Sequence, residues 1–202
     1  MKFQLIVACA ILLFIIAILS DSAWAQELEP RAYQPAPIGL NAFTFSYTHS
    51  TGDILFEPSF PAEDVQANLH LESAGYYHTF DFFGRFANVS VGVPYAAGHL
   101  NGRVEGISRE IYRSGLGDIR TRFAMSLKGT PAMTMAEFIK HHRKTNIGVS
   151  LVVSAPTGQY DPKKVINVGQ NRWAFKPEVG LSKFYKKWQM DVYGGVWFFS
   201  AN

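Results

Sequence analysis

The sequence predicts an all-β fold, an antiparallel up-and-down transmembrane β-barrel of about eight strands with one short loop helix. Three observations support this prediction. Segments of about ten residues alternate apolar with polar or small side chains, as strands do when lipid covers one face and water the other. Aromatic residues make up 14% of the chain, and 17 glycines suit closely packed strands. An apolar leader at the start indicates export.

The leader has the features of a secretory signal peptide. Lys2 precedes an unbroken apolar run at 5–19, and Ala23 and Ala25 provide the small residues of a cleavage site. The run is shorter than the roughly 20 residues that span hydrocarbon as a helix, which disfavours a retained anchor. The expected divisions are a signal peptide at 1–25, a periplasmic lead-in at 26–39 and an outer-membrane β-barrel domain at 40–202.

Cysteine content and charge exclude several classes of protein. Cys9 is the only cysteine and lies within the leader, so the exported chain would lack disulfides, zinc fingers and thiol chemistry. A net charge of +3 with 17% charged residues gives no indication of a nucleic-acid partner. We expect outer-membrane lipid as a partner, in the outer membrane of a Gram-negative bacterium, with the oligomeric state left open.

The first three strands are expected before Pro94. Residues 41–48 alternate cleanly, with Phe43, Phe45 and Tyr47 on one face and hydroxyl side chains on the other. A loop is expected at 50–64, a less regular strand at 65–80 and a tight connection at 81–85. The third strand, at 87–93, should end at Pro94 because proline has no N–H to donate to a ladder.

The fifth strand gives the clearest sign of a watery interior. Asn101-Gly102 is a hairpin signal, so a weaker fourth strand is expected at 103–112, followed by a turn at 115–117. In the fifth, at 119–128, apolar residues occupy one face and Arg120, Arg122, Ser126 and Lys128 the other. A soluble sandwich could show the same alternation, but the leader and the repeated strands favour an outer-membrane barrel.

Residues 130–144 break the strand pattern. Pro131 follows Thr130, a potential helix cap, and Met135 and Ile139 stand at helical spacing, which predicts a short helix within a loop. Glu137 and His141 would share one face of that helix. Because Arg143 and Lys144 would repel a cation, we expect a solvated helix end, with no metal site and no cofactor.

Three further strands are expected at 147–155, 173–182 and 188–199. The seventh should point Lys176 and Glu178 inward, and Pro177 between them should mark a bulge or the membrane rim. Both connections around the sixth strand are long, although up-and-down barrels alternate long loops with short turns. Either one segment is misassigned, or one long connection faces the periplasm.

Residues 156–180 carry the most specific motif. Pro156-Thr157-Gly158-Gln159-Tyr160-Asp161 precedes Asn171-Arg172-Trp173 and the run from Phe175 to Gly180, and Val93-Pro94-Tyr95 and Gly115-Leu116-Gly117-Asp118 stand upstream. This combination resembles the bacterial outer-membrane family named after the meta-pathway of phenol degradation. The resemblance implies a β-barrel transporter that is longer than this chain. Accordingly, the chain is either a fragment of a larger barrel, or its eighth strand closes the barrel unaided.

The predicted function is an outer-membrane transporter or channel, and the resemblance implies small hydrophobic or aromatic, phenol-like solutes as its cargo and partners. The sequence has no recognisable catalytic triad motif or dinucleotide fingerprint, so we expect no enzyme. The alternatives are a plugged barrel with a structural or surface-interaction role and, less favoured, an outer-membrane enzyme. The lumen-lining candidates are Arg120, Arg122, Lys128, Lys176 and Glu178. The motif-loop candidates are Pro156, Thr157, Gly158, Tyr160, Asp161, Asn171, Arg172 and Trp173.

Overall fold

The computed structural model describes residues 33–54, 62–104, 107–141, 145–164, 166–185 and 188–202. The expected signal peptide and the first half of the lead-in fall at 1–32, outside the described residues. Within the described ranges, no helix is long and apolar enough to cross a membrane.

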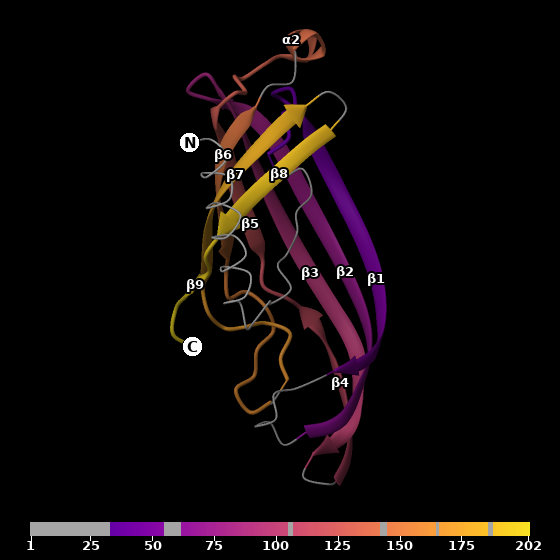
Figure 1. Ribbon diagram of the computed structural model, residues 1–202. Coiled ribbons are helices and arrows are strands. Elements are labelled where there is room, and N and C mark those ends of the chain that lie inside the picture. The colour runs from indigo at the N-terminus through magenta and orange to yellow at the C-terminus, as the bar shows by residue number, and fades with distance from the viewer. Residues whose placement is uncertain (1–32, 55–61, 105–106, 142–144, 165, 186–187) are drawn as a thin grey trace, which may run out of the picture. The chain divides into compact units, whose positions relative to one another are not determined.

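A single antiparallel sheet makes up the fold and curls into an open half-barrel (Figure 1). Seven strands lie side by side in the order β1-β2-β3-β5-β6-β7-β8, while β4 pairs with β3 and β9 with β7. The predicted all-β, antiparallel architecture is confirmed. The strands are β1 (Asn41–Ile54), β2 (Ala62–Phe82), β3 (Arg85–Val104), β4 (Ile107–Leu116), β5 (Arg120–Lys128), β6 (Asn146–Ser154), β7 (Ala174–Tyr185), β8 (Trp188–Gly195) and β9 (Phe198–Phe199).

Strands β4 and β5 lie end to end along the same side of β3. Tyr95 of β3 pairs with Leu116 of β4, and Gly92 of β3 pairs with Arg120 of β5. The predicted reversal at 115–117 is therefore wrong, because the chain keeps its direction through this segment. Between β4 and β5 the ladder is interrupted, but the Gly117 amide there still donates to the Pro94 carbonyl of β3 (2.8 Å).

Strand β3 continues through Pro94 and through Asn101-Gly102, where the sequence predicted an end and a turn. Both predictions are wrong, since β2 pairs with β3 in unbroken register from Asn101 back to Arg85. Pro94 falls between the residues that pair with β5 and those that pair with β4. In a strand the N–H and C=O of one residue point to the same side, so the missing N–H of Pro94 faces the interruption.

Pro177 also lies where the neighbouring strand is interrupted. Its register with Leu151 of β6 is continuous, so β7 has no bulge on that side. On the other side, Val196 and Trp197 separate β8 from β9 opposite the proline, and the Val196 amide donates to the Pro177 carbonyl at 3.3 Å. The expected bulge is thus a break in the adjacent strand, where the ladder would need the N–H that proline lacks.

The first connection and the start of the helix both differ from the prediction. Strand β1 extends to Ile54 and β2 begins at Ala62, so both ends of the loop expected at 50–64 are strand, and its middle at 55–61 lies outside the described residues. Helix α2 (Met135–Lys140) is capped by Thr134, and the expected cap at Thr130 is wrong. The Glu137 carboxylate accepts from the Thr134 amide (2.8 Å) and closes a capping box, which determines where the helix begins.

Each end of the half-barrel carries one long connection. The connection with α2 lies at the same end as the tight turn between β2 and β3, whereas the loop between β6 and β7 lies at the opposite end (Figure 1). Both flanking strands, β6 and β7, are present as predicted. The segment that was misassigned is the reversal expected at 115–117, and the two long connections around the sixth strand lie at opposite ends of the sheet.

The register gives the sheet an inner and an outer face of opposite character. On the outer face, a row formed by Val89, Phe123 and Leu151 crosses three strands. Phe43 and Phe45 of β1 point the same way and are 74% and 83% exposed. On the inner face, the row Ala124, Ser150 and Glu178 crosses β5, β6 and β7, and all three residues are buried.

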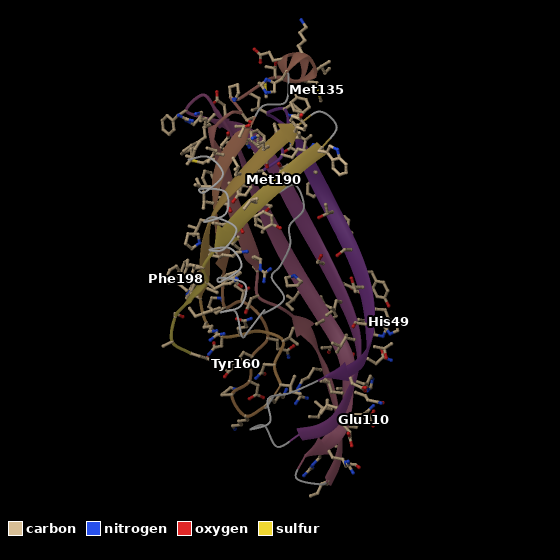
Figure 2. The ribbon with its side chains drawn as sticks, in the orientation of Figure 1. His49, Glu110, Met135, Tyr160, Met190 and Phe198 are labelled. Carbon is tan, nitrogen blue, oxygen red and sulfur yellow. The ribbon has the colours of Figure 1, made fainter. Side chains whose placement is uncertain are left out.

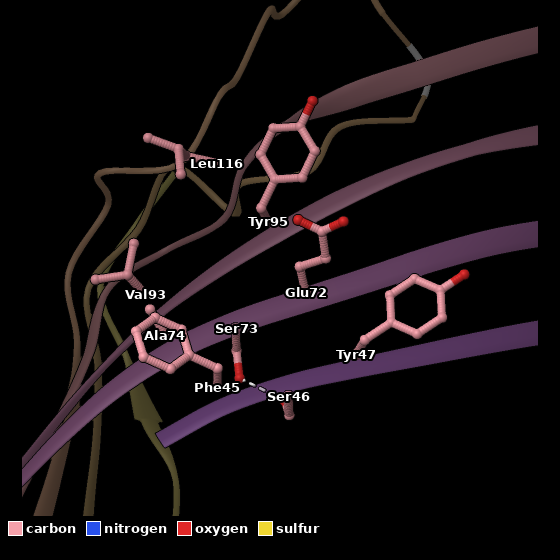
Figure 3. A pocket seen from close by; sticks show the side chains of 9 residues that line it. All are labelled: Phe45, Ser46, Tyr47, Glu72, Ser73, Ala74, Val93, Tyr95 and Leu116. Carbon is pink, nitrogen blue, oxygen red and sulfur yellow. Dashed lines mark hydrogen bonds between the residues drawn. The ribbon is translucent and has the colours of Figure 1, made fainter. Parts of the chain in front are cut away.

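The outer face changes from apolar to polar along the long strands. Tyr47, Glu72 and Tyr95 form one cross-strand row, beside a groove of about 460 Å³ that Phe45 and Leu116 also line (Figure 3). Beyond this row the outer face carries stacked His49 and His70, and His99 paired with Glu110. Figure 2 shows His49 and Glu110 far from Met135 of α2, so the polar extension lies at the end away from the helix.

Candidate functional site

The phenol ring of Tyr33 lies against the inner face of β5, β6 and β7. Its hydroxyl donates to Glu178 Oε1 (2.8 Å) and lies 3.1 Å from Ser150 Oγ. Ser150 and Glu178 are register partners on neighbouring strands, so both side chains reach the same spot. Tyr33 is only 6% exposed. We call the set of Tyr33, Arg122, Ser150, Lys176 and Glu178 the inner polar cluster.

Two glycines form the floor under the Tyr33 ring. Gly148 of β6 pairs with Gly180 of β7, and a Cβ atom at either position would collide with atoms of the ring. Any larger residue at these two positions would occupy the space that the ring fills. The absence of side chains there therefore creates a flat slot in the sheet with the dimensions of one aromatic ring.

Hydrogen bonds from two directions hold the lead-in segment in place. Asn146 Nδ2 donates to the Tyr33 carbonyl (2.7 Å), and the Ser126 hydroxyl donates to Asn146 Oδ1 (2.6 Å). A few residues later, the Thr79 hydroxyl donates to the Pro37 carbonyl (2.7 Å) and the Gly39 amide donates to the Thr79 carbonyl (2.8 Å). The segment is consequently fixed both at Tyr33 and where it enters β1.

Two cations approach the buried carboxylate of Glu178. Lys176 Nζ lies 3.2 Å from Oε2, and Arg122 Nη2 lies 3.7 Å from Oε1. The Arg122 guanidinium also lies over the Tyr33 ring, 5.2 Å from its centroid, in a cation–π arrangement. The side chains of all three charged residues are at most 13% exposed, so the cluster holds ion pairs largely shielded from water, with an excess of positive charge.

The protonation of Tyr33 follows from its burial. Tyr33 precedes the first strand, and burial raises the pKa of its phenol to about 12. The hydroxyl therefore keeps its proton at neutral pH and serves as the donor to Glu178.

Trp197 extends the cluster towards the end of β5. The Arg120 guanidinium lies 5.8 Å and Lys176 Nζ lies 5.7 Å from the centroid of the indole ring. Trp197 stands in the break between β8 and β9, opposite the Pro177 region of β7. The break thus places an aromatic ring within cation–π distance of two cations.

Of the five lumen-lining candidates, Arg122, Lys176 and Glu178 contact one another, and Arg120 reaches them through Trp197. Lys128 is not part of this group. A register irregularity between Ser126 and Lys128 pairs Lys128 with Ile147, which shares the outer face with Leu151, and Lys128 is exposed.

Asp118 organises the motif loop. Its carboxylate accepts from the Gly158 amide (2.9 Å) and the Gln170 amide (2.8 Å), closing the two ends of the loop onto the interruption between β4 and β5. The Thr157 hydroxyl accepts from the Ile119 amide (2.9 Å) and reinforces that contact. Gly158 and Gly169 pack so closely that neither could carry a side chain without displacing the other's backbone.

The remaining motif residues support the loop and the C-terminal segment. Pro156 begins the loop, Tyr160 is half-buried within it, and Asp161 accepts from the Lys163 amide (3.0 Å) (Figure 2). Trp173 exchanges hydrogen bonds with Ser200, and Asn171 Nδ2 donates to Asn202 Oδ1 (2.8 Å). The Arg172 guanidinium lies 4.2 Å from the centroid of the Phe199 ring. The motif residues thus stabilise the motif loop and bind the C-terminal segment beside it, at one end of the half-barrel.

The loop also covers an apolar patch on the inner face of the long strands. Ile166 of the loop packs against apolar side chains of β2 and β3, and the Ile166 carbonyl accepts from Arg113 Nε (3.0 Å). We call the set of Val65, Ala67, Leu69, Leu100 and Ile166 the inner apolar cluster. The inner face is therefore charged beside Tyr33 and apolar at the end that carries the motif loop.

Sequence reasoning missed Tyr33, Ser150 and Trp197. Tyr33 stood in a proline-rich lead-in without periodicity, and Ser150 is one of many small inward residues. The one usable signal is that Gly148 and Gly180 fall at inward positions of two adjacent strands, which indicates that something large packs there. Among the described residues, no group of three or more His, Cys, Asp or Glu side chains could hold a metal ion.

Comparisons with known proteins agree with this geometry. Residues 40–202 match the family described as "Putative MetA-pathway of phenol degradation". The fold is similar to the crystal structure of an outer membrane channel from Pseudomonas putida F1, with a TM-score of 0.61 and 19% sequence identity, covering 86% of this chain and 61% of that one. This chain thus spans less than two thirds of that channel, and no curated protein matches it. Because the match covers the whole described sheet from Leu40 onward, the chain belongs to the family of the phenol-degradation MetA pathway.

Proposed function

We propose that the chain forms part of the wall of an outer-membrane channel for small aromatic, phenol-like solutes, and that a cleaved signal peptide exports it to that membrane. The contrast between the two faces of one sheet carries this proposal. Phe43 and Phe45 are exposed on the outer face, while the inner face buries the ion pairs around Glu178. This is the polarity that a sheet needs between lipid and a polar lumen.

The strand lengths fit a bilayer. Strands β5 and β6 have 9 residues each, which matches the roughly 9–11 residues of a tilted transmembrane strand. Strands β2 and β3 have 21 and 20 residues, and their outer face becomes polar beyond Tyr47 and Tyr95. We assign this extension to the cell exterior, because outer-membrane barrels have their longer strands and loops on that side.

The charge of the inner face supports a phenolic cargo. The positive excess beside Glu178 would favour a phenolate or a polar substituent. The family links the chain to phenol degradation, which favours phenols over other aromatic compounds. The proposal assigns the chain no enzymatic activity.

Flux through liposomes tests the channel. The full-length native gene product is reconstituted, and uptake of radiolabelled phenol is compared with that of glucose, with protein-free liposomes as background. We expect phenol uptake several times the background, together with a mobility shift between unboiled and boiled samples on a denaturing gel. Uptake equal to that of protein-free liposomes would refute the channel.

A plugged barrel is the second candidate, favoured by one observation. Tyr33 and its ion pairs fill part of the inner face, as in narrow barrels whose lumen is occupied by side chains. The variant Arg120→Ala/Arg122→Ala separates the two functions. A channel changes its flux or its selectivity between phenol and benzoate, whereas a plugged barrel loses stability and shows no flux in either form.

A further inference from the structure

The side chain of Tyr33 is a phenol, and the inner polar cluster encloses it as a receptor would enclose a ligand. We propose that the slot under Tyr33 is a binding site for one monocyclic phenol, and that Tyr33 occupies this site when no such solute is present. This assignment rests on the proposed channel, since a solute would reach the slot along the inner face.

Each part of the slot matches a part of a phenol molecule. Gly148 and Gly180 provide a flat floor for one face of the ring, and the Arg122 guanidinium covers the ring at 5.2 Å. Glu178 Oε1 accepts the hydroxyl proton at 2.8 Å, and Ser150 Oγ lies 3.1 Å from the same oxygen. A ring without a hydroxyl would leave the buried carboxylate without this donor, and such a loss discriminates strongly between ligands.

The present occupant comes from the lead-in and not from the barrel wall. Tyr33 precedes β1, and its ring reaches the slot from a segment that is hydrogen-bonded to Thr79 and Asn146. A tethered ring competes with a free phenol through its effective concentration, which for this hydrogen-bonded segment should be at least the roughly millimolar value of short flexible tethers. Free phenols should therefore bind weakly to the wild-type protein and much more tightly once the Tyr33 ring is removed.

Ligand binding to the full-length protein in detergent tests the site. The variant Tyr33→Ala opens the slot, and p-cresol, which has the chemical structure of the tyrosine side chain, is titrated by calorimetry. We expect one p-cresol per chain and an affinity at least about tenfold higher than that of wild type. Toluene, which lacks only the hydroxyl, should bind about tenfold more weakly than p-cresol.

Tyr76→Ala is the matched control. It also removes one phenol, but from the outer face, where the Tyr76 hydroxyl donates to Asn41 Oδ1 (2.6 Å). Equal p-cresol uptake by wild type, Tyr33→Ala and Tyr76→Ala would mean partition into the micelle and would overturn the site. Equal binding of p-cresol and toluene to Tyr33→Ala would overturn it too, because the slot would then be an unspecific apolar cavity.

A less disruptive substitution tests the proposal if Tyr33→Ala does not fold. Tyr33→Phe keeps the ring on its glycine floor but loses the hydroxyl, so the tethered competitor is weaker and p-cresol should bind more tightly than to wild type. Identical affinities for wild type and Tyr33→Phe would then contradict the proposal. Ser150→Ala in either background should weaken p-cresol binding.

The two proposals can fail separately. Specific p-cresol binding without phenol flux would leave the binding site standing and refute the channel. Phenol flux without a specific gain in p-cresol binding on loss of the Tyr33 hydroxyl or ring would leave the channel standing and refute the site.

Discussion

The inner polar cluster and the inner apolar cluster use the same construction on one face of the sheet. In each, a large side chain packs over glycine on a neighbouring strand: Tyr33 over Gly148 and Gly180, and Leu69 over Gly98. They differ in what surrounds that side chain. Ion pairs and hydroxyls surround Tyr33, whereas Val65 and Leu100 lie in the cluster with Leu69. Glycines thus make the space, and the neighbours determine its chemistry.

This difference has an energetic consequence. Apolar burial is non-directional, so the apolar cluster should tolerate changes that conserve volume. The polar cluster depends on the positions of individual atoms, because a buried charge without its partner is costly. Four predictions follow from the comparison, from the largest expected effect to the smallest.

Glu178→Ala should be the most damaging substitution in either cluster. It removes the acceptor of Tyr33 and leaves Lys176 and Arg122 without their shared carboxylate, at a cost of about 3–5 kcal/mol. Urea unfolding in detergent measures the change. Adding Arg122→Met should recover part of the loss, and strictly additive effects of the two substitutions would show that their side chains are not coupled.

Leu100→Ala should cost less, about 2–3 kcal/mol, because it leaves a cavity among Val65, Ala67 and Leu69. The same urea titration measures it. Leu100→Met serves as the control, since it conserves volume and should cost under about 1.5 kcal/mol. A larger loss for Leu100→Met than for Leu100→Ala would contradict non-directional packing at this end.

Gly180→Ala should destabilise the protein by about 1–3 kcal/mol, because its methyl group collides with the Tyr33 ring. Gly194→Ala is the control, since a Cβ at Gly194 meets nothing within 4 Å. The double variant Tyr33→Ala/Gly180→Ala should be no less stable than Tyr33→Ala alone. If Gly180→Ala and Gly194→Ala behave alike, Tyr33 does not rest on the glycine floor.

Protonation of Glu137 should give the smallest loss of stability, because it affects only α2, which lies outside both clusters. Hydrogen bonds from the Thr134 backbone and hydroxyl lower the pKa of its carboxyl group. The capping box therefore stabilises α2 above the ordinary pKa of a glutamate, and this contribution is lost as the pH falls through the lowered pKa. Carboxyl carbon chemical shifts, followed by NMR between pH 6 and 2, should give a midpoint below the ordinary value. In Thr134→Val the midpoint should move upwards, and an unchanged midpoint would contradict the assignment.

Most of the fold was predictable because alternation is a local property of a strand. The faces assigned to Phe43, Phe45 and Tyr47, and to the apolar residues of β5, follow from a period of two and need no knowledge of the neighbours. The failures lie at Pro94, Asn101-Gly102 and 115–117. At each of these, tertiary pairing with β2 or β3 overrode a local turn or strand-end signal.

The site was predictable only in part. Inward positions of Arg122, Lys176 and Glu178 followed from alternation, but their mutual contacts depend on the register between β5, β6 and β7. Lys128 was expected on the same face as Arg122, but a register irregularity after Ser126 pairs it with Ile147 instead. Asp118 was visible in a motif, yet its role in closing a loop 40 residues away required the folded chain.

By itself, the sequence determined that this protein builds an antiparallel sheet with an apolar and a polar face, and that it belongs with the family whose motif it carries. Only the tertiary structure decided that β4 and β5 lie end to end beside β3. It also decided that Tyr33 donates a hydrogen bond to Glu178, 145 residues further along the chain. The physical reason is that side-chain alternation is set by each strand alone. Contacts between distant residues depend instead on strand register and on the space that glycines leave, which emerge only when the sheet is assembled.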